Sequence, residues 1–154
     1  MPRMELIAGE VQDILVVLGT AGDRPNVDRE RFAAYLPLGG AIDPTWLDLF
    51  SESARLTTDS STPTDFIDAR IELGAEGDAL TIERVDPAWI SAIARLPDSI
   101  IDAVTGRWID RIEEEIGELP REEKPWIREM ASQVVGFCRI ADRAPDVVFV
   151  WALA

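Results

Sequence analysis

The sequence predicts a mainly α-helical α+β fold, a compact helical domain with a small, minor β component. Two long segments, 97–116 and 125–143, carry apolar residues at steps of three and four, the period of an α-helix. Two segments, 81–85 and 147–151, have the clear composition of strands. A chain of 154 residues has the usual length of one domain, so we expect a single globular domain over residues 1–154.

The first long helix is predicted from Pro97 to Ile116. Its apolar residues fall on one face: Ile101, Val104, Trp108, Ile112 and Ile116. Pro97 suits the first helical position, and Asp98 complements the helix dipole at that end. Gly117 is placed to adopt the left-handed conformation that often ends a helix.

The second long helix is predicted over residues 125–143. Its apolar face consists of Trp126, Ile127, Met130, Val134, Cys138 and Ala141. We expect the two long helices to pack as a helical hairpin joined near Pro120. Cys138 is the only cysteine of the chain, so it has no internal disulfide partner, and its place in an apolar pattern predicts a buried thiol.

Two further helices are predicted from a shared start signal, Asp-Pro-x-Trp, at residues 43–46 and 86–89. In each, the aspartate can accept hydrogen bonds from the free amides of the first turn. The proline fixes the backbone angle of the first helical position, and the tryptophan begins the buried face. The similarity ends after a few residues, so we interpret it as two uses of one signal rather than as a repeat.

The remaining segments leave alternatives open. Residues 10–18 read as a helix or as a buried strand, and residues 66–73 as a helix or as the first arm of a hairpin. Asn26 or Asp28 is a candidate cap for a helix through Phe32 and Leu36. Residues 57–64 are predicted to be a polar loop, and residues 147–151 a fully buried strand.

The net charge and the apolar runs of the chain indicate which classes of partner it is not expected to bind. The sequence has 29 acidic and 15 basic side chains, a formal net charge of -14. Such a surface repels phosphate backbones, so direct nucleic-acid binding is not expected. The apolar run 14–18 is too short to span a bilayer, and the acidic residues before it do not fit a signal peptide. We therefore expect a soluble, cytoplasmic protein without a membrane partner.

The chain contains no histidine, which removes several kinds of catalytic site. Ser-His-Asp and Cys-His nucleophiles, His-ligated zinc and the Glu-x-x-His di-iron sites all need this side chain. No Walker loop, Gly-x-Ser-x-Gly elbow or Cys-x-x-Cys pair is present either. We expect no cofactor, and an enzymatic role is disfavoured but left open.

Carboxylates are the remaining chemically active groups, and they are densest at residues 113–123. This stretch contains six of them: Glu113, Glu114, Glu115, Glu118, Glu122 and Glu123. One interpretation is an acidic docking patch for a basic partner, and the other is a solvated helix end. Acids in a last turn oppose the helix dipole, so the second interpretation requires compensation from Arg107 or Arg111.

A metal site is the alternative use of the carboxylates. Helical nucleotide pyrophosphatases place a Glu-x-x-Glu pair opposite a Glu-x-x-Asp pair across magnesium, and Glu115 and Glu118 match the first spacing. The following helix offers Arg139 and Asp142 where the second pair would be, which breaks the pattern.

A second pair with the right spacing lies far upstream, at Glu10 and Asp13. These two residues, with Glu115 and Glu118, are the candidate ligands of a carboxylate-dependent, magnesium-using hydrolase. The favoured hypothesis is instead a non-catalytic protein-interaction or regulatory module, which binds another protein or forms a homo-oligomer.

Overall fold

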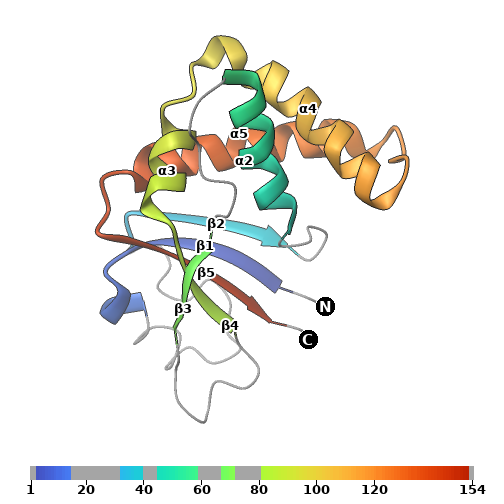
Figure 1. The fold of residues 1–154 in the computed structure, drawn as a ribbon. Coiled ribbons are helices and arrows are strands. Elements are labelled where there is room, and N and C mark those ends of the chain that lie inside the picture. Colours follow the sequence, from blue (N-terminus) through green and yellow to red (C-terminus); the bar gives the residue numbers. More distant parts are fainter. Residues whose placement is uncertain (1–2, 15–31, 40–44, 59–66, 72–80, 153–154) are drawn as a thin grey trace.

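The computed structural model describes residues 3–14, 32–39, 45–58, 67–71 and 81–152. In these residues four helices cover one face of a five-stranded β-sheet (Figure 1). The α+β class is confirmed, and the described helices contain more residues than the strands. No helix in the described ranges is both long and apolar enough to cross a membrane.

The sheet is antiparallel throughout, with the strand order β2-β1-β5-β4-β3. The strands are β1 (Arg3–Gly9), β2 (Ala34–Gly39), β3 (Ile67–Ile71), β4 (Thr81–Val85) and β5 (Asp146–Ala152). The first and last strands, β1 and β5, therefore lie side by side at its centre. Pro37 lies in the edge strand β2, where a missing backbone amide is tolerated best.

Both faces of the sheet are buried at its central strands β1 and β5, which explains the composition of β5. Leu6 pairs with Phe149 on the face that meets the helices, and Ile7 pairs with Val148 on the opposite face. All four of these side chains are buried. A strand that is covered on both sides has no polar face, so β5 is apolar at successive positions, as the sequence predicted for 147–151.

The helices are α2 (Thr45–Thr58), α3 (Pro87–Ala94), α4 (Asp98–Ile116) and α5 (Glu123–Ala141). Helix α2 packs mainly on α4 and helix α3 on α5, while α5 also lies over β2. The rings of Phe50 and Trp108 meet edge to face, with centroids 4.8 Å apart. The indole of Trp108 also donates a hydrogen bond to the carbonyl of Trp46 at 2.7 Å, so this buried polar group is satisfied.

The start signals predicted from sequence form helices. The side chain of Asp86 accepts a hydrogen bond from the amide of Ala88 at 2.8 Å, and Pro87 occupies the first helical position of α3. Helix α2 begins at Thr45, directly after the other Asp-Pro pair, which lies outside the described residues. In both helices the tryptophan of the signal is buried.

The long helices are confirmed with small changes at their ends, but Ile116 and Trp126, which were expected on the buried faces, are exposed. Pro97 is the N-cap of α4 rather than its first helical residue, so the helix begins one residue later than predicted. Gly117 has the predicted positive φ, 96°, and its amide bonds the carbonyl of Glu113. Residues 117–122 join α4 to α5, but each helix of this hairpin packs more extensively on another partner, α2 or α3.

The sheet decides two open or incorrect expectations, and a short helical turn bears on a third. Strand β3 pairs antiparallel with β4, which supports the hairpin alternative for 66–73. Residues 11–14 are helical, while 15–18 lie outside the described residues. Of the polar loop predicted over 57–64, residues 57–58 are instead the end of helix α2, and 59–64 lie outside the described residues. The helix predicted through Phe32 and Leu36 is wrong, because Ala34–Gly39 is strand β2.

The error over β2 has a simple cause. Ala34, Leu36 and Leu38 are buried, while Pro37 between two of them is exposed, which is the period of two that a strand requires. Phe32 and Leu36 are also four residues apart, so the same residues fit one face of a helix. The candidate caps of that helix, Asn26 and Asp28, lie outside the described residues.

Candidate functional site

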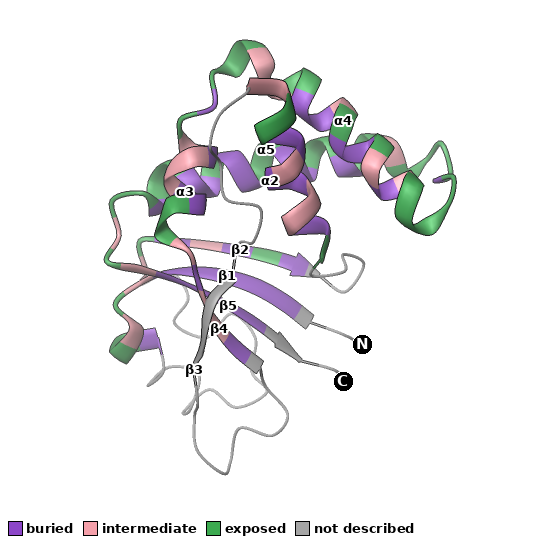
Figure 2. Cartoon of the chain, viewed as in Figure 1, coloured by how far each residue is buried: buried purple, intermediate pink, exposed green. Residues whose placement is uncertain are grey.

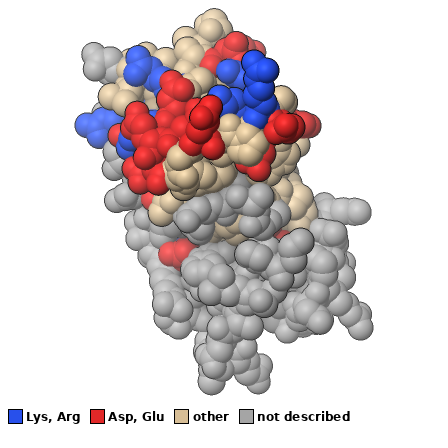
Figure 3. Space-filling view, turned by 90° about the vertical axis from the view of Figure 1, so that its right-hand side faces the viewer, with Lys and Arg blue, Asp and Glu red and all other residues tan. Residues whose placement is uncertain are grey.

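The acidic corner, residues 113–123, lies where α4 ends and α5 begins. Among the residues that the structure describes, acidic side chains gather over this end of the molecule, with basic side chains beside them (Figure 3). Five of the six predicted glutamates are exposed: Glu114, Glu115, Glu118, Glu122 and Glu123. Glu113 is therefore the one predicted glutamate that is partly buried.

Glu113 has a structural role within the corner. Its Oε2 atom accepts a hydrogen bond from the amide of Leu119 at 2.9 Å, and its Oε1 atom lies 3.6 Å from Nζ of Lys124. The side chain is only 21% exposed. Leu119 is buried, so this hydrogen bond satisfies a backbone amide that has turned away from water. Glu113 therefore shapes the turn and is not available to a partner.

Arg111 offsets the negative charge of the glutamates at the C-terminal end of α4. Its guanidinium bonds Glu114 and also lies 3.2 Å from Glu52 of α2 and 3.9 Å from Glu115. The pKa of Arg111 is raised by the hydrogen bond to Glu114 first and by that to Glu52 second. Of the two predicted candidates, Arg111 rather than Arg107 makes these contacts. Two of the five exposed glutamates therefore already have a cationic partner.

The other three exposed glutamates, Glu118, Glu122 and Glu123, make no ion pair within the described part of the chain. Two large apolar side chains accompany them on the surface. Ile116 is 58% exposed and Trp126 is 37% exposed. The corner therefore combines uncompensated negative charge with apolar surface, which a purely solvated helix end does not need.

The four candidate magnesium ligands are not brought together. Glu10 directly precedes the short helical turn at 11–14 and Asp13 lies within it, and this turn is on the opposite side of the molecule from the α4–α5 connection (Figure 1). Within the described ranges, no group of three or more acidic or cysteine side chains is arranged to hold a metal ion. Arg139, at the position where the second pair would need Glu, bonds Asp98 at 2.8 Å and the carbonyl of Leu96 at 2.7 Å.

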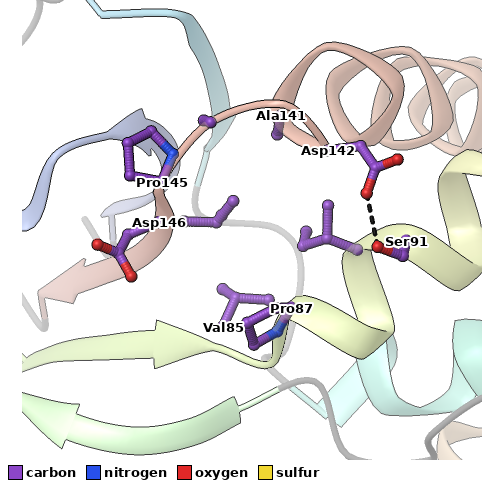
Figure 4. Close-up of a pocket in the computed structure, with 10 residues that line it drawn as sticks. Val85, Pro87, Ser91, Ala141, Asp142, Pro145 and Asp146 are labelled. Carbon is purple, nitrogen blue, oxygen red and sulfur yellow. Dashed lines mark hydrogen bonds between the residues drawn. The ribbon is translucent and has the colours of Figure 1, made fainter.

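A small cavity lies between the start of α3 and the α5–β5 connection (Figure 4). Its volume is about 50 Å³, far below the several hundred cubic ångströms of a typical ligand site. The hydroxyl of Ser91 donates to Asp142 across its rim at 2.6 Å, and Asp146 pairs with Arg84 at 3.0 Å. These contacts join α3 and β4 to the end of α5 and the start of β5, so we interpret the cavity as a structural junction.

Glu5 is a buried polar residue that the sequence did not single out. It is 1% exposed, on the face of the sheet away from the helices, and accepts a hydrogen bond from the hydroxyl of Tyr35 at 3.1 Å. Tyr35 lies in β2 and pairs with Ile7 of β1, so it reaches Glu5 diagonally across the two strands. The alternation of Glu5 with apolar neighbours is visible only once 3–9 is recognised as a strand.

Cys138 is buried as predicted. Burial raises the pKa of its thiol, and the nearby carboxylate of Asp142 raises it further. The thiol therefore stays protonated near neutral pH, where only a thiolate would act as a nucleophile.

Comparisons of the chain with protein-family models, with curated proteins and with solved structures give no significant match.

Proposed function

We propose that this chain is a non-catalytic protein-interaction domain whose acidic corner binds a basic segment of another protein. One observation carries the proposal. Glu118, Glu122 and Glu123 have no cationic partner in the described structure, and they lie in the same short stretch of chain as the exposed side chains of Ile116 and Trp126.

Each component of this surface has a physical role in binding. Uncompensated carboxylates attract a basic segment over distance and increase the association rate. Exposed apolar and aromatic side chains supply the contact area, and tryptophan is among the residues that most often dominate binding energy. Glu113 and Arg111 contribute indirectly, because their bonds hold the turn and the end of α4 in place. The partner is expected to combine Lys or Arg with at least one apolar side chain.

Affinity capture from native cytosol tests the proposal with two matched variants. Glu118→Lys/Glu122→Lys reverses two of the three unpaired charges of the corner, whereas Glu10→Lys/Asp13→Lys makes the same change in net charge at exposed residues far from it. A partner bound by wild type is expected to bind the control equally. Its association with the corner variant is expected to fall by at least about tenfold at low salt, because charge reversal places like charges opposite each other.

A salt titration of the recovered partner separates this mechanism from non-specific attraction to an acidic protein. Binding through the corner weakens steadily with ionic strength in wild type and in the control. Equal loss of binding in both double variants, or equal recovery of the same partner by all three proteins, would refute a role of the corner.

A further inference from the structure

One face of α5 is exposed along its whole length. We call it the α5 seam, and it consists of Trp126, Glu129, Gln133, Gly136 and Ile140. These residues follow one another at alternating steps of three and four, the spacing by which one helix contacts another in a coiled coil. The opposite face of α5 packs into the core through residues such as Met130 and Val134. The seam is therefore a helix face with the pattern of a contact surface, yet it lies in water.

The composition of the seam also fits contact with a helix. Trp126 is 37% exposed and Ile140 is 57% exposed, two of the few large apolar side chains left at the described surface. Gly136 lies between them, and a Cβ atom built there would meet nothing within 4 Å. The fold of the single chain thus gives no steric reason for glycine at this position. A second helix gives one, because glycine lets two helix backbones approach closely.

The two apolar residues of the seam lie at equal sequence distances from Gln133, whereas Glu129 and Gly136 do not. Trp126 precedes Gln133 by seven residues and Ile140 follows it by seven. Glu123, the first residue of α5, precedes it by ten residues, and Arg143 follows it by ten, in the turn just after the helix ends at Ala141. Both of these charged residues are exposed, and neither makes an ion pair within the described part of the chain. The seam therefore has an apolar residue on each side of its midpoint and opposite, unpaired charges at its two ends.

We propose that the α5 seam binds the α5 seam of a second copy of this chain, with the two helices antiparallel and a two-fold axis at Gln133. This arrangement places Trp126 of each copy beside Ile140 of the other. It also places Glu123 of each copy beside Arg143 of the other. A two-fold interface requires one surface to complement itself, and these two pairs meet that requirement.

The charges of Glu123 and Arg143 favour a second copy of α5 as the helix that binds the seam, and they favour its antiparallel orientation. A parallel arrangement would bring Glu123 against Glu123 and Arg143 against Arg143, whereas the antiparallel one pairs opposite charges at both ends. The net charge of -14 on each copy opposes association. That repulsion is screened beyond about 8 Å at physiological ionic strength, whereas the contacts within the seam act at shorter range. The dimer does not depend on the proposed function, but a dimer and a basic partner would compete for Glu123 and Trp126, because each arrangement uses both side chains.

Sedimentation equilibrium of the purified chain at physiological salt provides the first test. Wild type is expected to form dimers that dissociate on dilution, and Ile140→Glu is expected to weaken dimerisation by at least about a hundredfold, since it buries charge at two symmetric positions. Leu56→Glu is the matched control, because Leu56 is 55% exposed but lies on α2. A monomeric wild type at high micromolar concentration, or equal dissociation of the control, overturns the proposal.

A charge exchange tests the antiparallel pairing itself. Glu123→Arg and Arg143→Glu are each expected to weaken the dimer by about tenfold or more, because each change creates two like-charge contacts. The variant that carries both changes restores opposite charges and is expected to regain most of the affinity. A double variant that dimerises no better than either single variant overturns the antiparallel arrangement. The capture experiment changes neither Glu123 nor Arg143, so failure of one proposal is distinguishable from failure of the other.

Discussion

At the scale of single residues, identical side chains in one short stretch have different roles. Glu113 faces the turn and bonds the amide of Leu119, while Glu118 extends into water. Arg111 joins Glu52 of α2 to Glu114 and Glu115 at the end of α4. Each role follows from the direction of the side chain, which for Arg111 and Glu113 is fixed by the packing of α4 on α2 and α5, and for Glu118 by the connection after α4.

The role of Glu113 leads to a prediction of stability. Glu113→Ala leaves the buried amide of Leu119 without its acceptor, so we expect a loss of about 1–2 kcal/mol in the free energy of unfolding. Glu118→Ala removes a carboxylate that is exposed and unpaired, so its effect is expected to stay within about 0.5 kcal/mol. Urea denaturation of the two variants measures the difference. Equal effects would mean that the hydrogen bond to Leu119 contributes nothing.

At the scale of elements, local signals determine where the helices begin. Helix α3 starts with Asp86 in an extended conformation, its carboxylate on the amide of Ala88, and Pro87 at the first helical position. Trp89 and Ile90 then enter the core. The cap and the apolar face both place the start of the helix at Pro87, and together they stabilise α3 although it has only eight residues.

Removing the cap of α3 is expected to destabilise the protein. Asp86→Ala deletes the acceptor for the first-turn amide, and loss of such a cap typically costs about 1 kcal/mol. Asp86→Asn retains a good capping group, so we expect it to lose less stability. Thermal unfolding of both variants beside wild type checks the order. A variant with Asn that is as unstable as the one with Ala would assign the effect to charge rather than to the cap.

At the scale of the whole molecule, the sheet is centred on strands from the two ends of the sequence. β5 pairs with β1 on one side and with β4 on the other, so it connects the two halves of the sheet. On one face Phe149 packs under the helices, and on the other Val148 and Val150 join a second cluster with Ile7 and Ile82. Figure 2 shows this region as buried. The C-terminal segment was predicted to be buried, and Val147 to Val150 are.

The central place of β5 predicts severe effects of changes there. Phe149→Ala is expected to reduce the free energy of unfolding by about 3–5 kcal/mol, since it leaves a cavity between the sheet and the helices. Deletion of residues 146–154 is expected to prevent folding, because it removes the strand that joins β1 to β4. Circular dichroism with thermal melts measures both. Leu56→Ala, at an exposed site, is the control and should change stability by less than about 0.5 kcal/mol.

The sequence by itself determined the elements whose signals are local. The helices α3, α4 and α5 follow from apolar steps of three and four, from caps and from Gly117, all within a few turns of chain. The strands β4 and β5, the buried Cys138 and the exposure of most of the acidic corner were predicted for the same reason. Strand β1 was not recognised at all, and β2 was assigned to a helix, because short apolar runs fit both periods.

Only the tertiary structure decided the strand order, the separate role of Glu113 and the exposure of the α5 seam. Arg111 and Glu52 are 59 residues apart in sequence, and Ser91 and Asp142 are 51 apart. The separation of Glu10 and Asp13 from Glu115 and Glu118 is likewise a property of the fold. Local periodicity indicates which face of a helix or strand is apolar. It does not state which other face covers it, because that depends on contacts between residues that the chain brings together only by folding.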